Sequence, residues 1–422
     1  MTEWRYSKAD GQILFAYIHR KPYLCALLVR INNLIADILI LTLWLIGGYL
    51  FSRKDILSPA VLVAFVWLFA LLCYALLPHV LPPMGTKALT GVGLWAAGLV
   101  AGSLLMQSFS YSKRSMQIDK RIQEIYFWIS LACIPLLAVF VIQALGTNLD
   151  ASPAMRLRWA ALGKGQVDGA VYSPFYYVLW LVTYLLYLYD ADRQRWVRAV
   201  IMGVLVLAFG IASMSKLLIL NMGVMTLVVL YHKEVIRFRH LLAGAGVLAV
   251  VLLAFHAIRQ SKSLNGEYTA FLMEQYVLRN FFAFETVQPC SAAHWGENVF
   301  RIFYAVTYKL GIGTVEPVNT LLPWISEPVN TNTYTCLYPF YKDFGYWGIA
   351  LFAPVLGGLI GWVYKRKQQG DTFFTMLYAY FSTMLIIEFD AEMFFTCLAG
   401  NIKFVLLLML PFLFGGYKKV AE

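Results

Sequence analysis

Hydrophobic positions in this chain fall in long continuous blocks separated by short polar stretches. A helix needs about 20 apolar residues to cross a hydrocarbon layer of about 30 Å. Eleven blocks approach that length, and each predicts a membrane-spanning helix because unpaired backbone cannot face lipid. The blocks lie near residues 31–51, 56–78, 88–107, 125–145, 172–189, 199–213, 217–231, 241–257, 345–363, 373–388 and 394–414.

The N-terminal 30 residues do not fit this pattern cleanly. They carry several basic side chains, and the run His19-Arg20-Lys21 interrupts the apolar stretch 12–30. This segment is either an interfacial amphipathic segment or a poor first span, which would make twelve spans in all. No secretory signal peptide is evident at the start of the chain.

The amino-acid composition also indicates a membrane protein. The 422 residues are 60% hydrophobic and 14% charged, against roughly 25% charged residues in a soluble domain. These proportions exclude disordered, collagen-like and small disulfide-rich proteins. The net charge of +11 is typical of a membrane protein with basic cytoplasmic loops. No nucleic-acid-binding motif is present, so we expect no nucleic-acid partner.

The distribution of Lys and Arg predicts the orientation. Six short segments hold 17 of them, at 53–54, 113–121, 193–198, 233–239, 365–367 and 418–419. Because basic residues accumulate in cytoplasmic loops, these segments and the C-terminus are predicted to be cytoplasmic. The predicted organisation is then a helical region 31–257 with an external loop at 146–171, a large external loop at 258–344, and a C-terminal helical region 345–422. Loops this long usually have a function, and we expect short helices at the membrane surface within the larger one.

Basic side chains in the two external loops are the most informative candidates for chemistry. Guanidinium groups bind phosphate in bidentate fashion, which suits a phosphorylated or pyrophosphorylated ligand at the membrane surface. The alternative is pairing with lipid headgroups. The residues are Arg156, Arg158 and Lys164 in the first loop and Arg259, Arg279 and Arg301 in the second.

Three further features each allow two interpretations. Residues 298–310 predict an amphipathic helix on which Arg301, Tyr304 and Tyr308 share a stripe, suited either to a sugar beside a phosphate or to an ordinary surface helix. Lys216 at a tight external turn either extends to the membrane edge or neutralises a diphosphate. The acids at 388, 390 and 392 form either a solvated turn or a surface that faces a partner.

Motifs for other chemistries are missing. The sequence has no Walker loop, GxGxxG, HExxH, CxxC or GxSxG motif, and its six His residues show no metal-ligand spacing. We therefore predict neither a metal nor a cofactor. Cys290 and Cys336 share the large loop and are either a disulfide or two unrelated thiols.

The segment 330–348, NTNTYTCLYPFYKDFGYWG, resembles the Wzy-type oligosaccharide repeat-unit (O-antigen) polymerases. In those proteins an Asn-x-Tyr-Thr element leads to Pro-Phe-Tyr-x-Asp-Phe-Gly-x-x-Gly after the large periplasmic loop. The two unequal loops with arginines are also similar, as is the turn 213–216, where lysine replaces an arginine of the relatives. In sequence the resemblance covers this segment alone. The spacing of Arg, ten residues and Gly, present in both loops of some relatives, occurs here once, at Arg158 and Gly169.

The resemblance implies an all-α bacterial inner-membrane glycosyltransferase of GT-C-like architecture. It would polymerise undecaprenyl-diphosphate-linked repeat units into O-antigen or a related surface polysaccharide on the periplasmic face, without a metal. A flippase and a chain-length regulator of the same lipopolysaccharide pathway would be partners. An O-antigen ligase is one alternative. The other is a flippase or transporter of lipid-linked oligosaccharide, which the lack of paired repeats makes less favoured.

The resemblance also suggests roles for the candidate residues. Stabilisation of the leaving diphosphate would be the main task of the site. The predicted catalytic residues are Arg158, Arg259, Arg279, Arg301 and His294. The predicted substrate-binding residues are Arg156, Lys164, Lys216, Tyr304, Tyr308, Asn332, Tyr334 and Asp343. For the general base that would deprotonate the acceptor hydroxyl, His294, Glu267, Glu285 and Asp343 are all candidates.

Overall fold

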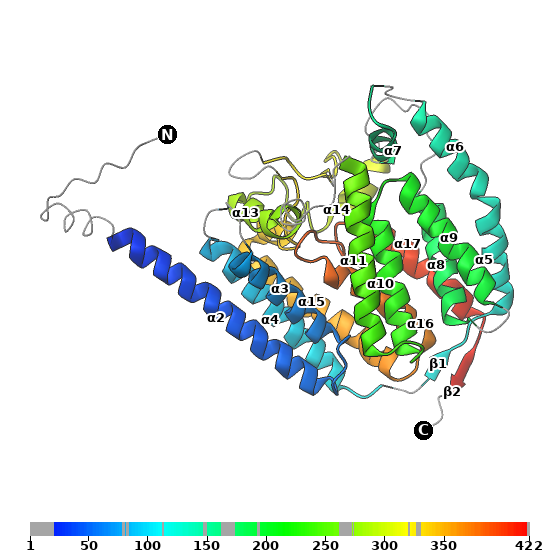
Figure 1. The fold of residues 1–422 in the computed structure, drawn as a ribbon, viewed down its shortest axis with the longest axis horizontal. Coiled ribbons are helices and arrows are strands. Elements are labelled where there is room, and N and C mark those ends of the chain that lie inside the picture. Colours follow the sequence, from blue (N-terminus) through cyan, green and yellow to red (C-terminus); the bar gives the residue numbers. More distant parts are fainter. Residues whose placement is uncertain are drawn as a thin grey trace, which may run out of the picture.

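The computed structural model shows a bundle of helices (Figure 1). It describes residues 21–77, 81, 84–111, 114–146, 150–161, 174–191, 195–260, 272, 274–319, 321–325 and 331–419. The helices are α2 (Lys21–Phe51), α3 (Pro59–Leu76), α4 (Thr86–Ser108), α5 (Lys120–Ala132), α6 (Ile134–Leu145), α7 (Pro153–Ala161), α8 (Pro174–Tyr189), α9 (Trp196–Ala212), α10 (Lys216–His232), α11 (Phe238–Gln260), η1 (Glu274–Leu278), α13 (Arg279–Thr286), α14 (Arg301–Lys309), α15 (Tyr338–Gln368), α16 (Thr372–Ile386) and α17 (Leu398–Leu413).

Helices occupy all eleven predicted blocks. Six are long and apolar enough to cross a membrane, and five shorter apolar helices accompany them in the described part of the chain. The fourth predicted span consists of two helices, α5 and α6, which meet at Cys133 just before Pro135. The fold is all-α, as predicted, and the length and apolar composition of these helices are consistent with the membrane protein that the hydrophobic pattern indicates.

One predicted boundary is wrong. Residues 21–30, assigned to a separate N-terminal segment, are continuous with the first span as part of α2. The ninth span was predicted from residue 345, and α15, which begins at Tyr338, breaks at that residue. Its first turns precede Gly345, whose φ of 63° breaks the helical geometry. A left-handed φ is favourable for glycine, so the chain bends here without the cost of a Cβ clash.

In the described part of the chain, the most extensive helix–helix contact is between α4 and α15. Glycines line the contact on both helices. A Cβ added at Gly102 would overlap the carbonyl oxygen of Pro354, and one at Gly361 would overlap that of Ser103. Small residues let two helix backbones approach closely, which replaces hydrophobic burial as the source of stability within lipid. This pair fixes the position of α15 and of the residues just before its bend.

The large loop folds into short helices, as expected: η1, α13 and α14 lie within it. In Figure 1, α7, α13 and α14 lie toward the end of the bundle opposite the small sheet formed by β1 (Arg114–Met116) and β2 (Tyr417–Lys419). The two strands are antiparallel, with Arg114 opposite Lys419. The two predicted external loops therefore share one end of the molecule, and the C-terminal strand lies at the other.

Candidate functional site

A cavity of about 300 Å³ lies at the end of the bundle formed by the two loops. Its walls come from α7, α14, the segment 318–322, the stretch 332–339 before and at the start of α15, and the connection 390–397 between α16 and α17. Among the predicted site residues, four line it: Arg158, Arg301, Asn332 and Tyr334. The structure therefore brings together side chains from both loops and from the segment that carries the family resemblance.

The two arginines of the cavity are held by different elements. Arg301 is the first residue of α14, and its Nε donates to the carbonyl oxygen of Val318 at 2.7 Å. Arg158 lies in the last turn of α7 and is half-buried. Its neighbour Arg156 has a different position, because its guanidinium donates to the carbonyl oxygens of Leu145 and Ala151. Arg156 thus ties α7 to the end of α6, whereas Arg158 and Arg301 line the cavity.

Acidic side chains also line the cavity, Asp390 and Glu392 of the α16–α17 connection. Asp390 lies on the α16–α17 connection and accepts a hydrogen bond from Asn280 Nδ2 at 3.2 Å. Burial raises the pKa of the Asp390 carboxyl to about 6, while the Asn280 hydrogen bond and the charge of Lys216 act in the opposite direction. A carboxyl group with this pKa is ionised at neutral pH and is well matched to accept a proton.

The other two acids of this connection are structural. The Glu392 carboxylate accepts hydrogen bonds from the backbone N–H groups of residues 394, 395 and 396. Glu388 Oε2 accepts from the indole N–H groups of Trp67 at 3.0 Å and Trp95 at 3.1 Å. Both carboxyl groups are buried. The interpretation of this stretch as a solvated turn is therefore wrong: donors from α3, from α4 and from the backbone of the connection itself compensate the cost of burying these two acids.

Arg279 and the aromatic stripe lie away from the cavity. Arg279 forms an ion pair with Glu274 at 2.8 Å. The predicted stripe of α14 does not act as one surface, because Tyr304 donates to the carbonyl oxygen of Trp295 while Arg301 faces the cavity. Tyr308 is 46% exposed. The hydrophobic face of α14 is also exposed, which is compatible with a helix at a membrane surface.

The candidate bases named from the sequence also lie elsewhere. Asp343 accepts from the backbone N–H groups of Asn298 and Val299 at 3.1 and 2.8 Å, and from Asn298 Nδ2 at 2.6 Å. It thereby anchors the segment that leads into α14. Glu285 accepts from the backbone N–H of Ala88 at 2.8 Å, in the first turn of α4. The ring of His294 packs near Tyr304 and does not line the cavity. Lys164, Glu267 and the side chain of Arg259 lie outside the described residues.

Lys216 belongs to a polar cluster beside the cavity wall. Its Nζ lies 2.6 Å from His256 Nδ1 and 3.8 Å from the centroid of the Tyr276 ring. The Tyr276 hydroxyl is 3.0 Å from the same His256 nitrogen. Asn280 connects this cluster to the cavity, since its Nδ2 donates both to the Tyr276 carbonyl oxygen and to Asp390. No pattern in the sequence singles out His256, Tyr276 or Asn280, because their elements meet only in the folded protein.

The two loop cysteines are separate thiols, Cys290 exposed and Cys336 buried, so the disulfide interpretation is wrong. Within the residues that the structure describes, no group of three His, Cys, Asp or Glu side chains could hold a metal ion. None of the protein-family models, curated proteins or solved structures compared with the chain matches it. What the site can do therefore follows from its own chemistry: two guanidinium groups to bind an anion, and a carboxylate to accept a proton.

Proposed function

We propose that the protein is a membrane glycosyltransferase that polymerises undecaprenyl-diphosphate-linked oligosaccharide repeat units, as its resemblance to the Wzy-type polymerases implies. The observation that supports this most is the convergence of Arg158 and Arg301 on one cavity. The same cavity contains Asn332 and Tyr334 of the segment that carries the resemblance. In this proposal the cavity opens on the periplasmic side of a bacterial inner membrane, and the bundle is of the GT-C-like type.

The reaction needs an anion site and a base. The bond between the anomeric carbon of the donor glycan and the diphosphate oxygen breaks, and the acceptor hydroxyl oxygen forms the new glycosidic bond. Arg158 and Arg301 stabilise the negative charge that develops on the leaving diphosphate. Asp390, which lines the same cavity, takes the proton of the acceptor hydroxyl. Lys216 adds positive charge close to Asp390.

Purified protein in detergent, supplied with its lipid-linked repeat unit alone, tests the proposal. We expect a ladder of products that differ by one repeat. Arg158→Ala and Arg301→Ala should each lower the rate by roughly 10²–10³, the usual effect of removing one group that stabilises developing charge. Lys309→Ala is a matched control, because Lys309 lies exposed at the far end of the same helix as Arg301.

Two results would contradict the proposal. Folded protein that gives no ladder but transfers the glycan to an added lipid A core would be a ligase. A ladder formed at the wild-type rate by both arginine variants would show that the cavity is not the polymerising site. Arg279→Ala separates the cavity from the wider set of loop arginines, since its Glu274 pair lies outside the cavity and we expect the ladder to persist.

A further inference from the structure

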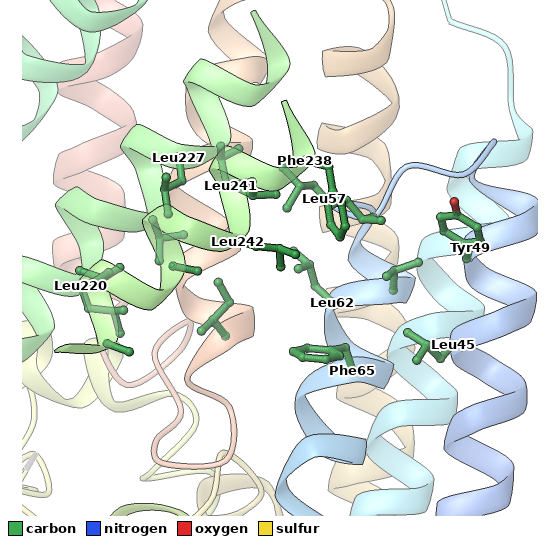
Figure 2. A pocket seen from close by; sticks show the side chains of 18 of the residues that line it. Leu45, Tyr49, Leu57, Leu62, Phe65, Leu220, Leu227, Phe238, Leu241 and Leu242 are labelled. Carbon is green, nitrogen blue, oxygen red and sulfur yellow. The ribbon is translucent and has the colours of Figure 1, made fainter. Parts of the chain in front are cut away.

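An apolar groove of about 640 Å³ runs between two pairs of helices, α2 with α3 on one side and α10 with α11 on the other (Figure 2). Leu45 and Phe65 line the first wall, and Leu220 and Leu242 line the second. Helix α16, which packs against both α3 and α10, contributes Ile386. Tyr49 has the only polar side-chain atom among the lining residues. The groove can therefore hold a hydrocarbon chain but offers little to a polar ligand.

The polar cluster of Lys216 continues the second wall of the groove. Leu220 lines the groove on α10, and Lys216 lies four residues before it; Leu252 lines the groove on α11, and His256 lies four residues after it. Residues four apart share one face of a helix and are separated by about 6 Å along its axis. Lys216 and His256 therefore meet about one helical turn beyond the end of the apolar lining.

The cluster in turn adjoins the cavity. Asn280 hydrogen-bonds to Tyr276 on the cluster side and to Asp390 on the cavity side. Apolar groove, cation and polar cavity thus follow one another in space. A molecule with a long apolar chain, an anionic group and a sugar has the same order of parts.

We propose that the groove binds the polyisoprenyl chain of a lipid diphosphate, with the chain-bearing phosphate beside Lys216 and the sugar-bearing phosphate and its sugar in the cavity with Arg158 and Arg301. The identity of the sugar-bearing ligand rests on the proposed function. Charge complementarity selects this occupant over a second protein helix, since the Lys216 ammonium lies between the apolar lining and the polar cavity. Exposed apolar side chains such as Phe65, Phe238 and Leu242 stand along the walls of the groove, as expected for a groove that a lipid chain can enter.

Lipid tails are as apolar as the groove, so moving a chain from the bilayer into it gains little free energy. The charged group beside Lys216 must then supply most of the affinity, and the groove supplies orientation. A neutral polyprenol should consequently occupy the groove no better than bulk lipid. The diphosphate of the same chain should occupy it selectively.

Photo-crosslinking in nanodiscs tests this directly. The probes are a polyprenyl diphosphate with a diazirine on its isoprenoid chain and the matching neutral polyprenol. We expect the diphosphate probe to label groove residues of α3, α10 and α11 roughly tenfold more than the neutral probe, and Lys216→Met to remove that difference, as expected for loss of a charge-assisted contact. Labelling that is equal for the two probes would overturn the proposal and indicate ordinary lipid in the groove.

Two alanines of α11 provide matched variants. Ala249 lines the groove and Ala243 does not, although both are exposed on the same helix. Ala249→Trp should fill the groove and abolish its labelling, whereas Ala243→Trp should label as wild type does. Ala245→Trp, also in the groove, serves as a second variant if Ala249→Trp does not fold. Equal labelling of both kinds of variant would contradict the proposal.

The two proposals fail separately. Crosslinking needs neither an acceptor nor turnover, so groove labelling that persists in protein that makes no ladder would refute the polymerase and leave the lipid-diphosphate site. If Ala249→Trp forms the ladder at the wild-type rate and the probe labels other residues, the proposal that the groove binds the lipid chain is refuted. The proposal of polymerase activity is then retained.

Discussion

The contact between α4 and α15 makes a quantitative prediction for Gly102→Ala. The added Cβ would overlap the Pro354 carbonyl oxygen and lie 2.9 Å from the Gly358 nitrogen, whereas an ordinary contact begins at 3.4 Å. Both atoms belong to the α15 backbone, so neither can rotate away, and α15 must move by at least about 0.5 Å. Overpacking of this kind costs roughly 1–3 kcal/mol. The gain in helix propensity from Gly to Ala returns only about 0.5–1 kcal/mol.

Thermal unfolding in detergent, followed by tryptophan fluorescence, measures the effect. We expect a lower Tm for Gly102→Ala. Gly246→Ala on α11 is the matched control, because a Cβ there meets no atom within 4 Å. That variant keeps only the propensity gain, so its Tm should equal or exceed the wild-type value. Equal stability of the two variants would refute the steric reasoning. Since Tyr338 and Pro339 at the start of α15 line the cavity, Gly102→Ala should also lower the polymerisation rate.

Three further predictions concern the buried acids. Burial raises the pKa of Asp390 to about 6, and its ionised form is the proposed base, so kcat/KM should rise with pH through about 6 and level off above it. Asp390→Asn should remove this rise of kcat/KM with pH and most of the rate. Glu388→Leu leaves the indole N–H groups of Trp67 and Trp95 without this acceptor, at a cost of about 1–3 kcal/mol each, so its Tm should fall further than that of Glu388→Gln. Asp343→Ala should expose the segment around Asn298 to limited proteolysis.

Each of these three has a contradicting result. If kcat/KM of Asp390→Asn still rises with pH through about 6, another group is responsible for that rise. Equal Tm values for the Leu and Gln variants would show that the indole hydrogen bonds contribute little. Wild-type resistance to proteolysis in Asp343→Ala would show that its three hydrogen bonds do not hold the segment.

The hydrophobic pattern predicted the helices because lipid leaves the backbone no alternative. It did not mark the short helical segment before Gly345, because that segment includes Lys342 and Asp343 and is not an apolar block. The break between α5 and α6 was also hidden, since both sides of Cys133 are apolar. In each case the boundary depends on local geometry and packing rather than on hydropathy.

The site could be predicted in part. Arg158 and Arg301, which line the candidate cavity, were singled out because arginines in loops predicted to be external run against the usual charge distribution. Arg279 could not be separated from them, since its partner Glu274 lies five residues earlier. The intervening π-helix η1 suits that spacing, whereas the α-helical spacing of three or four residues does not. Asp390 was left undecided because only the folded α16–α17 connection buries it beside Asn280.

The pairing of α4 with α15 has a consequence for how the protein is made. About 230 residues separate the end of α4 from the start of α15. At about 5–20 residues per second, α4 is in the membrane for roughly 10–50 s before its partner is synthesised. During that time its glycine face contacts lipid or other helices, and α15 must displace them. Assembly of the cavity is thus a late event of biosynthesis, and a weakened α4–α15 contact should appear in cells first as degradation of newly made protein.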